Sequence, residues 1–81
     1  METRVAIISI IVKNRETVSQ LNEILHTYAD YIIGRMGLPY PPKKVSIMSV
    51  VVDAPQDIIS ALSSKIEALP NISVKTTYAD A

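Results

Sequence analysis

The chain has 81 residues, and eight Lys and Arg side chains balance eight Asp and Glu, so its formal net charge is zero. A domain that binds DNA by itself usually carries a clear basic excess, because phosphate neutralisation supplies most of the affinity, and we therefore expect no direct nucleic-acid partner. The lack of cysteine excludes disulfides, thiolate metal sites and cysteine nucleophiles. This length corresponds to a single domain, residues 1–81, with an aliphatic core, since Phe and Trp are absent.

The first apolar run, VAIISIIV, spans residues 5–12 and predicts a β-strand. Its eight residues are too few to span a bilayer. The run also lacks the basic segment and the small-residue cleavage site of a signal peptide. We therefore expect a cytoplasmic protein that has no membrane partner.

A helical pattern follows this run. Its apolar residues recur at spacings of three and four: Val18, Leu21, Leu25 and Tyr28. Asn14 is expected to cap the helix, because its side-chain oxygen can accept from the free amides two or three residues later. His26 falls on the polar side of the helix. One imidazole without converging ligands forms no metal site, so we interpret His26 as a solvated residue and expect no bound metal.

The stretch YIIGRMGLPYPPKKV, residues 31–45, contains both glycines of the chain and three of its five prolines. Pro41 and Pro42 predict the turn of a β-hairpin, because proline cannot donate to a strand ladder. Gly34 and Gly37 lie in the extended segment before that turn. They favour a β-bulge in an edge strand or, alternatively, a point where another backbone or a ligand approaches closely.

The chain matches itself at an offset of 40 residues, since VAIISIIV and VSIMSVVV, residues 45–52, are identical at four of eight positions. A second helical pattern follows, with apolar residues at Ile58 or Ile59, Leu62, Ile66 and Leu69. Pro55 is expected at its first position, and Pro70 should end it near Leu69. The closing segment ISVKTTYA, residues 72–79, alternates as an edge strand does.

Asp53 and Asp57 flank the start of the second helix. Two carboxylates this close could act as an acid–base pair, but helix capping and dipole complementarity also account for them. No nucleophile with a recognisable base accompanies them, so we expect no catalytic residue. The segment Gly34-Arg35-Met36-Gly37 is not a phosphate loop, because it lacks the GK[ST] ending and opens no helix.

Two strand–helix–strand halves in series predict the ferredoxin-like βαββαβ sandwich, an α+β fold with a four-stranded antiparallel sheet and two helices on one face. From the right-handed crossover rule we expect residues 5–12 and 45–52 to be adjacent central strands, and parallel to each other. Both runs are apolar on both faces, as central strands require, whereas the glycine-bearing and alternating segments suit the edges.

Two helices can cover only one face of such a sheet. One face of the central strands carries Val5, Ile7, Ile11, Val45, Ile47 and Val51, and the other carries Ala6, Ile8, Ile10, Val12, Met48, Val50 and Val52. Whichever face is open exposes a contiguous apolar surface, which monomers in solution rarely show. We therefore expect a homo-oligomer, a dimer or a tetramer.

Three segments carry a resemblance: RVAIISIIVKNRETVSQLNEILHTYADYIIGRMGLPY, then VSIMSVVVDA, then ISVKTTYA. Together they resemble the small ACT-like proteins regarded as regulators of the iron-only hydrogenase system. More distantly, the chain is similar to the ACT-like regulatory domain of the nickel-responsive repressor. The resemblance implies an ACT-like, ferredoxin-like fold and a regulatory role. The repressor's metal site of several histidines and a cysteine does not carry over to a chain with one His and no Cys.

One group of basic residues is suited to binding a ligand. Lys13 and Arg15 flank the start of the first helix, where free amides and the helix dipole favour an anion. Lys43 and Lys44 at the hairpin add positive charge. The candidate ligand-binding residues are Lys13, Asn14, Arg15, Gly34, Arg35 and Gly37, and the candidate ligand is an anionic small molecule. Amino-acid-binding ACT domains usually have glycine in this turn, whereas here it reads KNRE, residues 13–16.

These observations predict a non-enzymatic, ligand-sensing regulatory domain without a cofactor. One alternative is a structural oligomerisation or protein-interaction module that has no small-molecule ligand. A small enzyme of the ferredoxin-like dimeric-barrel type is a further alternative. It is disfavoured because its cavity would need a polar or aromatic catalytic group, and the strand faces here are mostly Val, Ile and Ser.

Overall fold

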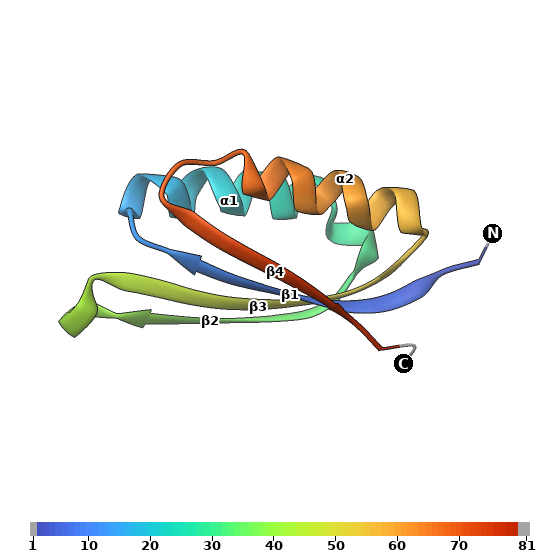
Figure 1. Ribbon diagram of the computed structural model, residues 1–81, viewed down its shortest axis with the longest axis horizontal. Helices are drawn as coiled ribbons and strands as arrows, with labels where there is room; N and C mark the ends of the chain where they lie inside the picture. Colours follow the sequence, from blue (N-terminus) through green and yellow to red (C-terminus); the bar gives the residue numbers. More distant parts are fainter. Residues whose placement is uncertain (1, 80–81) are drawn as a thin grey trace.

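A computed structural model describes residues 2–79 of the chain. The elements follow the order β1 (Arg4–Val12), α1 (Arg15–Thr27), β2 (Ile32–Tyr40), β3 (Val45–Ala54), α2 (Gln56–Glu67) and β4 (Ile72–Tyr78). The four strands form one antiparallel sheet in the order β2-β3-β1-β4. Both helices lie on the same face of the sheet (Figure 1). The predicted α+β, ferredoxin-like arrangement is confirmed.

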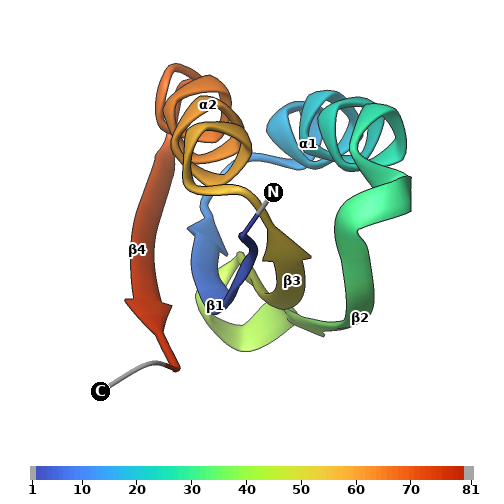
Figure 2. The same ribbon diagram turned by 90° about the vertical axis from the view of Figure 1, so that its right-hand side faces the viewer.

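The predicted parallel pairing of β1 and β3 is wrong, because these central neighbours are antiparallel along their whole length. The crossover rule concerns the strands at the two ends of each strand–helix–strand unit. Here those strands are not neighbours, since β3 lies between β1 and β2, and β1 lies between β3 and β4. Each half is thus split by a strand of the other half, which places antiparallel neighbours throughout the sheet (Figure 2).

The helix α1 begins as its sequence predicts. Asn14 has extended backbone geometry, and its Oδ1 accepts a hydrogen bond from the Glu16 amide at 2.8 Å, which satisfies one donor of the first turn. The helix α2 begins one residue later than expected, because Pro55 is its N-cap and not its first helical residue. Pro55 makes no side-chain cap bond. The two helix starts therefore differ in how their free amides are satisfied.

The β2–β3 hairpin turns through a short 3₁₀ segment, Pro41–Lys43, followed by Lys44 in the left-handed region at φ 55°. The predicted proline turn is thus confirmed. A register shift between Ile32 and Gly34 marks a β-bulge, which confirms the bulge expected in this edge strand. Gly37 pairs regularly with Met48. In Figure 1 the hairpin extends to one side of the helix layer and carries β2 along the outer edge.

The core lies between the sheet and the helices. It consists of Ala6, Ile8, Ile10, Val12, Leu21, Leu25, Met48, Val50, Val52, Ala54, Ile59, Leu62 and Ile66. The spacing of apolar residues predicted in both helices is confirmed, and of the two alternatives in α2 it is Ile59 that is fully buried. Figure 2 shows α2 over the β4 side of the sheet and α1 over the β2 side.

The opposite face of the sheet has no helix over it in either view (Figures 1 and 2). The structure thereby settles which strand face is covered: Ile8 on β1 is fully buried, whereas its neighbour Ile7 is 42% exposed. Among the described residues, no helix is long and apolar enough to cross a membrane.

Candidate functional site

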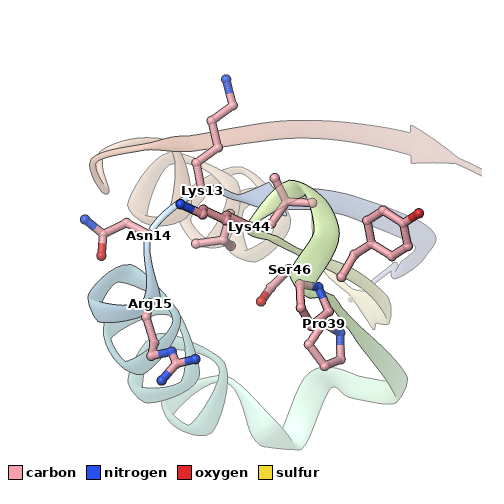
Figure 3. A pocket seen from close by; sticks show the side chains of 10 residues that line it. Lys13, Asn14, Arg15, Pro39, Lys44 and Ser46 are labelled. Atoms are coloured by element: carbon pink, nitrogen blue, oxygen red, sulfur yellow. The ribbon is translucent and has the colours of Figure 1, made fainter.

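A groove of about 450 Å³ lies between the start of α1 and the hairpin turn. Its lining residues come from both segments: Val12, Lys13, Asn14, Arg15, Pro39, Tyr40, Pro41, Lys44, Val45 and Ser46. In Figure 3 the Arg15 side chain lies on the helix side and Pro39 on the hairpin side, while Lys13 extends away from both. Three cationic side chains and no carboxylate line the groove, so its electrostatic potential favours an anion.

Hydrogen bonds within the chain already use three amides at and just before the start of α1. The Lys13 amide donates to the Asn71 carbonyl at 2.9 Å, and the Thr17 amide donates to the Asn14 carbonyl at 3.1 Å. The Glu16 amide donates to the Asn14 side chain. An anion in the groove would therefore rely on the side chains of Lys13, Arg15 and Lys44 more than on the helix amides.

The other predicted ligand residues lie elsewhere. Arg35 projects from β2 on the helix side and donates to Asn22 Oδ1 of α1 at 2.8 Å, which ties the strand to the helix. Gly34 and Gly37 lie along β2 and do not line the groove. Of the six predicted residues, the structure brings together Lys13, Asn14 and Arg15, and it adds Lys44 and Ser46.

Metal-ligating side chains do not cluster within residues 2–79, where no group of three or more His, Cys, Asp or Glu could hold an ion. His26 is exposed in the last turn of α1, as predicted. Asp57 is exposed in the first turn of α2, where its charge complements the helix dipole, and Asp53 is exposed at the end of β3.

A polar cluster that the sequence did not indicate joins β1, α2 and β4. The Arg4 guanidinium lies over the Tyr78 ring at 3.9 Å from its centroid and donates to Gln56 Oε1. Gln56 in turn donates to the Tyr78 hydroxyl at 2.8 Å. Because these contacts fix the ends of three elements to one another, we interpret the cluster as structural.

The helix-free sheet face is the second candidate site, and we call it the open face. Strand register places three rows of side chains across it, in the order β2, β3, β1, β4: Leu38-Ile47-Ile11-Ser73, Met36-Ser49-Ser9-Lys75 and Gly34-Val51-Ile7-Thr77. The apolar residues of the two central strands were predicted from the sequence, whereas those of β2 were not. The period-two alternation of Met36, Leu38 and Tyr40 is the signal that could have found them.

A family model described as "Iron-only hydrogenase system regulator, putative", the TM1266-like family, matches residues 4–76. The chain therefore belongs to the TM1266-like family. The structure of an uncharacterised protein, TM1266 from Thermotoga maritima, superposes with a TM-score of 0.93 at 31% identity, covering 98% of this chain and 100% of that one. The resemblance to regulators of the iron-only hydrogenase system found in the sequence is thus confirmed.

Other solved structures show the fold alone. An unknown protein from Galdieria sulphuraria has a TM-score of 0.72 at 20% identity, and the match covers 99% of this chain and 47% of that one. A formyltetrahydrofolate deformylase from Pseudomonas putida has a TM-score of 0.64 at 15% identity, covering 90% of this chain and 28% of the enzyme. A search of curated protein sequences finds no match.

Proposed function

We propose that this chain is a non-enzymatic, ACT-like regulatory domain of the iron-only hydrogenase system, acting in the cytoplasm by binding and not by catalysis. The observation that carries the proposal is membership of the TM1266-like family over residues 4–76. The match to the Thermotoga protein over nearly the full length of both chains supports a common architecture.

The groove chemistry supports binding over catalysis. Its polar side chains are three cations, the Asn14 amide and hydroxyls of Ser46 and Tyr40. This set can attract and orient an anion, but no carboxylate or imidazole lines the groove to act as a general base. The likeness to the deformylase covers 28% of that enzyme at 15% identity, so it supports no transfer of activity.

The finer part of the proposal is that the domain senses a small anionic ligand in the groove. The charge of Lys13, Arg15 and Lys44 supports the sign of the ligand, and a volume of about 450 Å³ supports a small molecule. Native mass spectrometry of protein purified from its own cells tests this part. A retained small anion is expected, and protein that carries none from cells growing with active hydrogenase would contradict ligand sensing.

The regulatory role itself is tested by deleting the gene in its host and restoring it in trans. We expect deletion to change hydrogenase transcript level, maturation or specific activity, and complementation to reverse the change. Hydrogenase transcripts, active-site assembly and activity that all stay at wild-type values across hydrogenase-inducing conditions would contradict the role.

A second function is supported by the open face, since a large apolar surface suits an assembly or protein-interaction module that needs no ligand. The two functions differ in one observable. A pure assembly module would complement the deletion even when Lys13 and Arg15 are both replaced by Ala, whereas a ligand sensor would not.

A further inference from the structure

The internal repeat gives the open face an approximate two-fold symmetry that passes between Ser9 and Ser49, which face each other across β1 and β3. The offset of 40 residues exchanges β1 with β3 and, at the edges, β4 with β2. At the edges the equivalence follows strand register, because the bulge in β2 adds one residue: Leu38, opposite Ile47, is equivalent to Thr77, opposite Ile7. Met36, opposite Ser49, is likewise the equivalent of Lys75, opposite Ser9.

The two equivalent edges differ in polarity. On β4 the open face carries Ser73, Lys75 and Thr77, which are compatible with water. On β2 it carries Met36, Leu38 and Tyr40, whose exposed fractions are 71%, 58% and 45%. Polarity therefore changes across the sheet from one edge to the other, and the apolar half is the one that includes β2.

The exposed apolar residues extend from β2 to β1, above and below a middle row in which Ser49 and Ser9 occupy the two central strands. They are Val5, Ile7, Ile11, Met36, Leu38, Tyr40 and Ile47, with Ile33 beside them at the bulge. Their exposed fractions correspond to a total accessible area on the order of 700 Å², backbone atoms included, close to the ~800 Å² of total area that each partner buries in a standard interface. Isolated monomers rarely expose an apolar patch larger than a few hundred Å², so a surface of this size suffices for a stable partner.

The charge of the open face is compatible with a second copy of this chain as its partner. Within the described residues of the open face, the register places one basic side chain, Lys75, and one acidic side chain, Asp53 opposite Val5. The face thus has no net charge, as the whole chain has none. Two copies facing each other meet no electrostatic repulsion, whereas a strongly charged partner would find no complementary field.

We propose that the β2–β3–β1 part of the open face is the interface with a second copy of this chain, and that the β4 edge lies at its polar rim. An isologous dimer uses the same patch on both partners, so a self-complementary apolar surface without net charge meets its requirement. The interface meets the proposed ligand groove at Tyr40, which lines both, whereas the cationic residues of the groove, Lys13, Arg15 and Lys44, are not among the apolar interface residues.

The test compares equivalent edge positions. Light scattering and sedimentation equilibrium on the wild type at tens of micromolar should give a multiple of the 8.9 kDa chain mass. The variant Leu38→Asp should raise the dissociation constant at least ~100-fold, because it buries an unpaired charge. The equivalent variant Thr77→Asp adds the same charge at the rim and should change the dissociation constant less than ~5-fold.

Met36→Asp is the second variant at the apolar edge. Met36 is 71% exposed in the single chain. The circular dichroism spectrum of the Met36→Asp variant should therefore stay native while the assembly dissociates. A wild type that is monomeric at tens of micromolar overturns the proposal, whatever else binds the face. Folded Leu38→Asp and Met36→Asp proteins that keep the wild-type mass overturn it too, and equal dissociation by Thr77→Asp overturns the placement of β4 at the rim.

Discussion

The two edge strands of the sheet solve the same structural problem in different ways. β4 (Ile72–Tyr78) presents polar side chains on the open face, while its alternate residues Ile72, Val74 and Tyr78 pack against the core, so it can end the sheet in water. β2 (Ile32–Tyr40) is longer, carries a bulge and exposes apolar side chains on the same face. An apolar edge of that length invites pairing or association unless something covers it. The repeated halves therefore share a core but differ in the surface that their edge strands expose.

The halves also differ where their helices begin. Asn14 caps α1 with its side chain, and the buried Thr17 hydroxyl donates to the Pro70 carbonyl at 3.0 Å, which ties that helix start to the turn before β4. Pro55 caps α2 with backbone geometry alone. The start of α1 thus depends on specific side-chain hydrogen bonds, whereas the start of α2 depends on the fixed φ of proline.

The largest expected effect is the difference between aspartate substitutions on the two faces of β1. Ile8→Asp places a carboxylate in the core and should unfold the domain, because burying an unpaired charge costs several kcal/mol of a stability that is itself only ~5–15 kcal/mol. Ile7→Asp, on the open face, should leave circular dichroism native and weaken assembly. Urea unfolding and light scattering on both variants check the pair. An unfolded Ile7→Asp protein beside a folded Ile8→Asp protein would reverse the assignment of the faces.

A smaller effect on the free energy of unfolding is expected from substitutions at the starts of the two helices. Asn14→Ala removes the side-chain acceptor of the Glu16 amide and should lower the free energy of unfolding by ~1 kcal/mol. Pro55→Ala removes no side-chain hydrogen bond and should lower it by about half as much or less, through the entropy of the unfolded chain. Urea denaturation of both variants measures the difference. A larger loss for Pro55→Ala would contradict the distinction between the two caps.

Local features of this fold could be predicted from the sequence because they depend on neighbouring residues. Helix periodicity, the Asn14 cap, the proline turn and the bulge near Gly34 all follow from short-range geometry. Features that depend on distant segments were predicted less well. The antiparallel pairing of β1 with β3 and the separation of Arg35 from the groove follow from strand register, which the local pattern does not contain.

The residues of the candidate site also divide into those that could be predicted from neighbouring residues and those that depend on distant segments. The sequence placed Lys13, Asn14 and Arg15 together because they are adjacent, but the contribution of Lys44 and Ser46 depends on where the hairpin turn meets the end of β1. The open face was predicted in part, since alternation identifies two faces for each strand. Which of these faces the helices cover could be read only from the structure.

Substitutions in the groove should have a small effect on stability and a clear effect on anion binding. Replacing both Lys13 and Arg15 by Ala should change the melting temperature little, because exposed charges contribute little to stability. Inorganic phosphate serves as the probe, and NMR shifts of the amides of residues 13–17 report its binding. Millimolar phosphate should shift them in the wild type and in the control Lys43→Ala, which does not line the groove, but not in the double variant. Equal shifts in all three proteins would contradict an anion site here.

The smallest expected effect is that of metal. With one His, no Cys and no cluster of ligating side chains within residues 2–79, untagged protein should bind nickel or zinc only weakly, through surface carboxylates. Isothermal titration calorimetry measures this. Stoichiometric binding at submicromolar concentration would show that the ligand inventory misses a site.

The contrast between the two edges can be measured directly, because a chain without cysteine accepts a single thiol as a probe. Met36→Cys and Lys75→Cys place that thiol at equivalent positions of the open face, one on each edge strand. Maleimide labelling is followed as the protein concentration rises from nanomolar to tens of micromolar. We expect the labelling rate of Met36→Cys to fall at least ~10-fold over that range, while that of Lys75→Cys stays nearly constant, as an interface core and its rim require. Labelling of Met36→Cys that stays fast at every concentration would contradict the account.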